Sequence, residues 1–393
     1  MPGETAKTKA DEFRDRAIEY PGVSAHAQLS VIITLATPLY GGGVEAGQLD
    51  KTTPFRASSI RGILRYWRRA TWGGQFDSWE KMREAESLIW GDTDRPSSVR
   101  VDVQFPNTWA NRRVSLRTYE RDLNRRFALF PPYNQKGVDL DDREKDFLEA
   151  GSFTLTLSVT DTKCKDDVEA ALWAWVNFGG LGARTRRGAG ALFCHHYAGW
   201  NAKFVYGDGA LRPWPTLKGG TIVWGPAKHA TSAWEDAWDD VLQLYREFRQ
   251  DRQGRGPTSW PEPDEIRAIR QNRGTPTKEG FPRGGLGLPI LFHFKDPQRI
   301  EPPDQTLSVE SYSGGGADRE PGRMTSPVIL KPLAMAKDLA YPMILVMNTQ
   351  QAGQMYLFQK GAKAEPVGAG RRDAVAELLL RAQRKWGGST ARI

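Results

Sequence analysis

Apolar and polar residues alternate along several stretches in the first half of the chain. From Leu29 to Leu35 every second residue is apolar, which is typical of a half-buried strand. Helical spacing of apolar residues follows from Ser58, where Ser58 and Ser59 offer an N-cap, and recurs before Gly179. The expected strands and helices lie, in chain order, at residues 29–35, 58–72, 99–105, 153–159, 166–178 and 191–195. This βαββαβ order is that of a ferredoxin-like domain.

A similar order begins again in the second half. It opens with a short strand and a helix whose apolar stripe is rich in aromatic residues. Strand-like runs and a terminal helix follow. The expected elements lie at residues 221–224, 232–249, 288–294, 327–333, 343–347 and 372–386. The chain is therefore predicted to be an α+β protein made of two copies of one architecture.

Breaks in these patterns set the expected domain boundaries. Residues 1–24 form a polar lead-in without the apolar core of a signal peptide. An N-terminal domain at 25–209 carries an arginine-rich insertion at 107–150, and a linker follows at 210–218. The C-terminal domain at 219–393 includes an irregular segment at 250–285, and Trp260 to Glu265 is expected to be an acidic loop.

Charge and cysteine content narrow the classes of partner and compartment. The sequence has 55 basic and 47 acidic residues, a net charge of +8, with arginine in excess over lysine. A modest basic balance favours a polyanionic partner, and the guanidinium fork suits phosphate. Two isolated cysteines, Cys164 and Cys194, fit a reducing cytoplasm, and no apolar stretch is long enough for a membrane span.

The segment from Gly179 to Leu192 carries the clearest chemical signal. Glycines allow positive φ and let backbone N–H groups approach an anion, while Arg184, Arg186 and Arg187 can fork onto phosphates. The segment follows a helix and precedes a strand, so it differs from Walker and dinucleotide loops, which open a helix. The alternative is a glycine-rich turn whose charges serve solubility.

The predicted helix after Arg56 is the second candidate. Its N-terminus with Ser58 and Ser59 could bind phosphate, and an arginine face could follow a nucleic-acid backbone. The alternative is an ordinary amphipathic helix with a charged outer face. The arginines in question are Arg56, Arg61, Arg65, Arg68 and Arg69.

Other ionisable residues suggest little catalytic chemistry. His195 and His196 are adjacent on an expected strand and would point to opposite faces, so they cannot chelate one metal. Asp239 and Asp240 fall within a helical pattern and are expected on a solvated face. No nucleophile and base can be paired from the sequence. We therefore expect no metal and no cofactor.

Taken in order, several short motifs resemble the first RAMP subunits of the Cmr complex, the type III-B CRISPR effector. They span about residues 29–350, and only the ordered set is specific. The motifs are Thr37-Pro38-Leu39-Tyr40-Gly41-Gly42, the Arg56–Arg69 helix, Ile89-Trp90-Gly91, Ser98-Val99-Arg100-Val101, Gly179–Leu192, Ser259-Trp260-Pro261 with Glu265-Ile266-Arg267, Gly287-Leu288-Pro289-Ile290, and Arg323 with Ser326-Pro327 and Lys331-Pro332.

The resemblance implies two ferredoxin-like domains of the RNA-recognition-motif type, with insertions. It also implies a non-catalytic cytoplasmic subunit near the 3′ end of the CRISPR RNA, beside other RAMP subunits, that contacts guide and target RNA. The Arg112–Arg126 insertion matches nothing in the family pattern.

The residues expected to hold RNA come from the glycine-rich segment and the helix after Arg56. They are Arg56, Ser58, Ser59, Arg61, Arg65, Gly182, Arg184, Arg186, Arg187, Gly188 and Gly190. Further contacts are expected from Tyr40, Arg68, Arg69, Arg323 and Lys331, whereas Trp90 is expected to be packed inside the fold.

Two other functions stay open at this point. One is a metal-independent RAMP-type endoribonuclease acting on CRISPR RNA, with His26 or His293 as general base. The other is a protein–protein adaptor whose arginines serve only solubility.

Overall fold

The computed structural model describes most of the chain. The described residues are 27–43, 48–50, 52–106, 113–115, 122–129, 146–251, 258–271, 279–294, 301–311 and 320–393. The predicted lead-in at 1–24, His26 and much of the insertion at 107–150 lie outside these residues. Both cysteines are free thiols.

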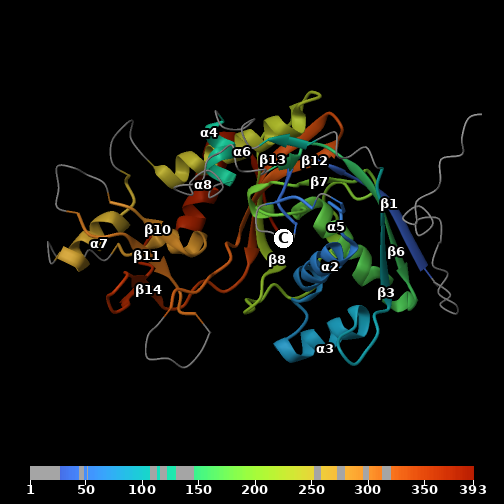
Figure 1. Cartoon of the computed structure of the whole chain (residues 1–393), viewed down its shortest axis with the longest axis horizontal. Helices are drawn as coiled ribbons and strands as arrows, with labels where there is room; N and C mark the ends of the chain where they lie inside the picture. The colour runs from blue at the N-terminus through green and yellow to red at the C-terminus, as the bar shows by residue number, and fades with distance from the viewer. Residues whose placement is uncertain are drawn as a thin grey trace, which may run out of the picture.

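The first sheet is antiparallel and has the strand order β3-β6-β1-β7. Two helices cover one of its faces, where apolar residues of both helices and strands form one core. Figure 1 shows the helices on the same side of the sheet. The elements are β1 (Ala27–Leu35), α2 (Ala57–Trp72), β3 (Val99–Gln104), β6 (Ser152–Val159), α5 (Lys165–Phe178) and β7 (Leu192–Phe193). Its strand order places the first and third strands of the βαββαβ repeat at the centre.

The second sheet has the order β12-β13-β8-β16, so the first and third strands of the repeat are again central. β16 pairs with β8 through Thr390 and Val223 and was not anticipated from the sequence. The elements are β8 (Thr216–Trp224), α6 (Ala233–Gln250), β12 (Val328–Ala336), β13 (Leu339–Asn348), α8 (Ala374–Trp386) and β16 (Ser389–Arg392); β9 (Lys228–His229) pairs with β13.

A third sheet, β10-β11-β14-β15, lies at the opposite end of the long axis from the first sheet (Figure 1). The run at 288–294 was expected to belong to the second repeat, but it contributes β10 to this separate sheet. The segment at 250–285 is not wholly irregular either, because it contains α7 and a 3-10 helix. The elements are α7 (Glu262–Gln271), η6 (Pro282–Leu286), β10 (Ile290–Phe292), β11 (Gln305–Ser308), β14 (Met355–Phe358) and β15 (Glu365–Val367).

Part of the arginine-rich insertion packs against the second half of the chain. The Arg125 guanidinium lies 3.1 Å from the Asp239 carboxylate and 5.2 Å from the centre of the Trp238 ring. Asp240 pairs with Lys228 at 2.8 Å, so the predicted solvated acidic face is instead ion-paired. The elements here are α4 (Leu123–Leu129) and a small sheet of β2 (Leu39–Tyr40), β5 (Asp146–Leu148) and β4 (Arg113–Ser115).

The two halves share one apolar core. Leu157 of the first sheet and Leu345 of the second belong to the same buried cluster. The expected linker at 210–218 is part of this packing, because β8 already begins at Thr216 and the Trp214 indole donates to the Gly73 carbonyl at 3.2 Å. The interface between the halves is therefore a continuation of the core.

The remaining elements connect the layers. They are α3 (Trp79–Trp90), η3 (Thr162–Cys164), η4 (Thr185–Arg187) and η5 (Ala202–Phe204). Within the part of the chain that the structure describes, no helix is long and apolar enough to cross a membrane.

Candidate nucleic-acid interface

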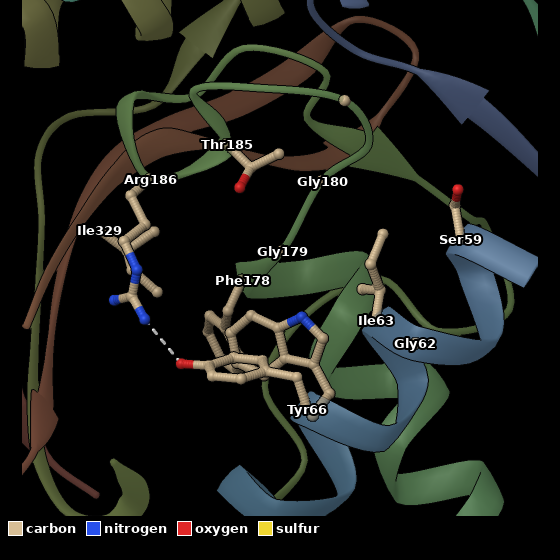
Figure 2. A pocket seen from close by; sticks show the side chains of 12 residues that line it. Ser59, Gly62, Ile63, Tyr66, Phe178, Gly179, Gly180, Thr185, Arg186 and Ile329 are labelled. Atoms are coloured by element: carbon tan, nitrogen blue, oxygen red, sulfur yellow. Dashed lines mark hydrogen bonds between the residues drawn. The ribbon is translucent and has the colours of Figure 1, made fainter. Parts of the chain in front are cut away.

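A cavity of about 340 Å³ lies between α2 and the glycine-rich loop at 179–190. Its floor is apolar and its rim carries hydroxyl groups. Figure 2 shows Ile63 and Tyr66 reaching in from α2 and Thr185 and Arg186 from the loop. The lining residues are Ser59, Gly62, Ile63, Tyr66, Trp67, Phe178, Gly179, Gly180, Gly182, Thr185, Arg186 and Ile329.

The loop keeps its shape through close backbone packing. Gly188 and Gly190 have φ of 79° and 63°, and a Cβ at Gly190 would lie 2.0 Å from the Leu181 carbonyl oxygen. Their N–H groups donate to the carbonyls of Thr185 and Pro38 at 3.0 and 2.8 Å. The sequence predicts that backbone N–H groups near Gly182, Gly188 and Gly190 bind an anion. In the structure, the N–H groups of Gly188 and Gly190 themselves hold the loop together.

Thr37 fixes the other side of the loop. Its hydroxyl donates to the Gly188 carbonyl at 2.5 Å and accepts from the Ala191 N–H at 2.8 Å. The Ala183 N–H donates to the Tyr40 carbonyl at 2.6 Å. The loop is thus anchored to Thr37 and to β2. No residue pattern around Thr37 predicts this role.

Arg186 connects three segments at the edge of the cavity. Its Nη2 donates to the Tyr66 hydroxyl at 2.8 Å, and its Nη1 donates to the Ser326 carbonyl at 2.7 Å. A second hollow of about 250 Å³ begins on the far side of this residue and is lined by Arg323, Ser326 and Gln350, among others. Arg186 therefore separates two adjoining hollows.

Arg187 points towards the second half of the chain. Its guanidinium lies 4.4 Å from the centre of the Tyr245 ring and donates to the Tyr245 hydroxyl at 2.9 Å. Burial lowers the pKa of Arg187. The Trp238 indole donates to its carbonyl at 2.8 Å. These contacts tie the loop to α6, and the role of Arg187 as an RNA ligand stays a prediction.

Arg184 and Arg323 are exposed; Arg184 precedes the cavity-lining Thr185 in the loop, and Arg323 lines the second hollow. Among the described residues, neither guanidinium has a hydrogen-bond or ion-pair partner. Partial burial lowers the pKa of Arg184, and the positive charges of Arg187 and Arg323 lower it further. Two neighbouring cations without counter-charges form a local excess of positive potential.

The arginines of α2 are instead paired within the protein. Arg65 and Arg69 both bind Glu86 of α3, with Arg69 at 2.6 Å, and Arg68 binds Asp167 of α5 at 2.9 Å. Arg61 donates to the Trp90 carbonyl. The predicted arginine face therefore clamps α3 and α5 onto α2, which favours the structural alternative for this face.

The N-terminus of α2 differs from its prediction. Arg56, not Ser58 or Ser59, occupies the N-cap position, and no side chain caps the helix there. The Arg56 guanidinium donates to the Gly42 carbonyl. Ser58 is exposed, whereas Ser59 lines the cavity. Of the two serines, the structure brings only Ser59 to the candidate site.

Several further expected RNA contacts are inaccessible. Lys331 is 0% exposed and donates to the carbonyls of Val176 and Gly179 at the C-terminus of α5. Tyr40 is 4% exposed and Arg68 is 3% exposed, so neither can meet RNA in this structure. Trp90 is packed, as the sequence predicted.

Sequence reasoning missed the cavity-lining residues Gly62, Tyr66 and Thr185. Gly62 did carry a signal, because a glycine in the interior of a helix costs about 1 kcal/mol relative to alanine and calls for an explanation. An added Cβ there would meet no atom within 4 Å, so close packing does not explain it.

The histidines lie away from this cavity. His293 is exposed, and its Nδ1 lies 2.8 Å from an Asp304 carboxylate oxygen. His195 and His196 follow β7 in an exposed turn, not on the strand that was expected. Over the described ranges, no group of three or more His, Cys, Asp or Glu residues could hold a metal ion.

Known proteins resemble both the sequence and the fold. The family model of the RAMP superfamily matches residues 32–193. CRISPR system Cmr subunit Cmr1-2 of Pyrococcus furiosus is 33% identical over 170 residues, which cover 40% of this chain and 89% of the relative. Subunit Cmr1-1 of the same organism is 28% identical over 141 residues, or 35% of this chain and 39% of that protein.

The crystal structure of apo Cmr1 from Pyrococcus furiosus is similar over 93% of this chain and 98% of that one, with a TM-score of 0.54 and 15% identity. This likeness shows a shared fold. Together with the sequence matches, it defines the class as that of RAMP proteins. The chain belongs to the RAMP superfamily and, within it, to the Cmr1 family.

Proposed function

We propose that this protein is a non-catalytic RNA-binding and architectural subunit of a type III-B CRISPR effector complex. Membership in the Cmr1 family supports the assignment to the complex. The observation that carries RNA binding is the pair of exposed, unpartnered guanidiniums of Arg184 and Arg323 beside the cavity, in the part of the chain that the structure describes.

These two arginines suit phosphate better than any other feature of the site. Internal carboxylates pair with Arg65, Arg68 and Arg69, whereas Arg184 and Arg323 repel each other and gain most from an external anion. An RNA backbone supplies such charges at regular spacing. The resulting binding would depend strongly on salt and little on sequence.

The wider assignment follows the family resemblance. We infer two ferredoxin-like domains of the RNA-recognition-motif type, supported by the shared order of strands in the first and second sheets. In the complex, the subunit would lie in the cytoplasm near the 3′ end of the CRISPR RNA. Its partners would be the CRISPR RNA, the single-stranded target RNA and the other RAMP subunits.

The endoribonuclease alternative receives little support. His26 lies outside the described residues, and His293 is absent from the residues that line the two hollows around Arg186. General-base catalysis needs an acceptor within hydrogen-bond reach of the ribose 2′-hydroxyl. No specific observation places one beside the expected RNA path.

Incubation of the purified, nuclease-treated protein with end-labelled single-stranded RNA tests the proposal. We expect retarded migration of intact RNA that weakens as salt is raised. Discrete cleavage products would favour the endoribonuclease instead. Absence of retardation, with binding to other Cmr subunits intact, would favour the adaptor.

A further inference from the structure

The cavity between α2 and the glycine-rich loop is chemically unlike a phosphate site. Trp67, Phe178 and Ile329 form part of its lining, and all three are at most 3% exposed. Among the described residues that line it, the one charged residue is Arg186, and each of its terminal nitrogens already donates a hydrogen bond. An apolar floor with a few polar groups at the rim suits a planar ring.

The polar groups of the lining lie where they can form hydrogen bonds with the edge of such a ring. Ser59 on α2 and Thr185 on the loop bring hydroxyl groups to opposite sides of the cavity (Figure 2). A hydroxyl can both donate and accept, which matches the mixed edge of a nucleobase. The volume of about 340 Å³ lies at the lower end of the range of about 300–1,000 Å³ for small-molecule sites.

Gly62 gives an independent reason to expect a ligand. It lies inside α2, where glycine weakens the helix, and no neighbouring atom requires its small size. Its missing side chain leaves open space that borders the cavity. A ligand that approaches the helix backbone at this point accounts for the glycine.

We propose that this cavity binds one unstacked nucleobase of the bound RNA, with the base between Gly62 and Tyr66 on α2 and Thr185 on the loop. Single-stranded RNA is commonly recognised through bases that leave the stack and contact aromatic side chains. The phosphates on either side would lie outside, near Arg184 and Arg323. This inference rests on the proposed function.

Filling the space at Gly62 tests the proposal. Gly62→Phe fills the cavity, Gly62→Leu does so with a strong helix former, and Gly62→Ala adds only a Cβ. The matched control is Ala376→Phe, at an exposed position of α8 that does not line the cavity. The binding probes are an oligouridine of ten nucleotides, an abasic phosphoribose chain of the same length, and uridine monophosphate. Thermal unfolding confirms that each variant is folded.

We expect both fillers to weaken oligouridine binding about tenfold, the order of one base–aromatic contact. Binding of the abasic chain should not change, Ala376→Phe should bind oligouridine like the wild type, and Gly62→Ala should lose less affinity than the two fillers. A folded filler variant that keeps wild-type oligouridine affinity would overturn the proposal, as would an equal loss with the abasic chain. Tight binding of uridine monophosphate alone would identify a free nucleotide as the occupant.

The two hypotheses fail in different ways. If the wild-type protein binds no RNA, the proposed function fails and the base site falls with it. If an Arg184→Ala, Arg323→Ala variant loses affinity while the Gly62 fillers do not, only the base site is wrong.

Discussion

Arg186 donates a hydrogen bond of 2.8 Å to the hydroxyl of Tyr66 and thereby joins the glycine-rich loop to α2. Its other terminal nitrogen holds the Ser326 carbonyl just before β12. One side chain therefore links elements from both halves of the chain. Because it also separates the two hollows, its contacts set the shape of the candidate site.

Removing the Tyr66 hydroxyl should loosen this link. We expect Tyr66→Phe to lower the free energy of unfolding by about 1 kcal/mol, because a half-buried guanidinium loses a neutral acceptor. Urea denaturation measures the change. Tyr341→Phe is the control, since the Tyr341 hydroxyl bonds no residue that the structure describes. Equal effects of the two variants would argue against the link.

Alanine substitution at two glycines should change the stability of the protein in opposite directions. Gly190→Ala should destabilise the protein by more than about 1 kcal/mol, because φ is positive and the Cβ meets the Leu181 carbonyl oxygen. Gly62→Ala should stabilise it by about 0.5–1 kcal/mol through helix propensity. Thermal unfolding compares them directly. A stable Gly190→Ala protein would contradict the loop packing described above.

Lys331 should make stability depend on pH. Burial lowers the pKa of its amine from 10.5 to about 7, whereas the unfolded chain keeps the ordinary value. Between about pH 7 and pH 10.5 the unfolded chain therefore binds more protons, and stability rises with pH. The gain is complete above that window and is lost as the pH falls to about 7.

Lys331→Met isolates this effect. From pH 7 to pH 9, we expect the unfolding free energy of the wild type to rise relative to that of the variant, by up to about 1.4 kcal/mol for each pH unit. Urea titrations at three pH values measure the difference. Parallel pH profiles of the two proteins would show that the buried amine does not titrate in this window.

Replacing Glu86 should lower the stability of the protein without weakening RNA binding. Its side chain is almost fully buried and receives both Arg65 and Arg69, so Glu86→Ala leaves two cations without their acceptor. We expect a loss of about 2–4 kcal/mol in unfolding free energy. RNA affinity of the folded variant should be unchanged or higher, as measured by filter binding. A loss of RNA affinity without a loss of stability would contradict the structural role.

Periodicity predicted the strands and helices that carry apolar patterns, and it failed where the pattern is polar. β16, with the sequence Ser389-Thr390-Ala391-Arg392, is mostly exposed and owes its place to pairing with β8. α7 begins among prolines and acidic residues, where its few apolar positions are easily overlooked. β10 belongs to the third sheet because it pairs with a strand that follows it in the chain, and the residues of β10 alone do not indicate that partner.

The glycine-rich loop and α2, both expected to hold RNA, line one cavity, but the contacts of their side chains could not be predicted. Arg65 and Arg69 read as nucleic-acid ligands until Glu86, on another helix, is brought to them by folding. Lys331 reads as a surface cation, yet it reaches carbonyls more than 150 residues away in sequence. Pairing between distant residues is decided by tertiary structure and has no local signature.

The salt dependence of RNA binding tests the central claim most directly. Two double variants remove the same net charge. One combines Arg184→Ala with Arg323→Ala, and the other combines Arg65→Ala with Arg69→Ala. Within the described structure, only the two arginines of the first variant have no hydrogen-bond or ion-pair partner. For the first variant, we predict that the slope of log affinity against log salt falls by about 1.4 in magnitude, as for two lost phosphate contacts on single-stranded RNA. For the second double variant, measured at a temperature at which it is folded, the slope should equal that of the wild type. Equal slopes for both double variants, or a fall only in the second, would contradict the account.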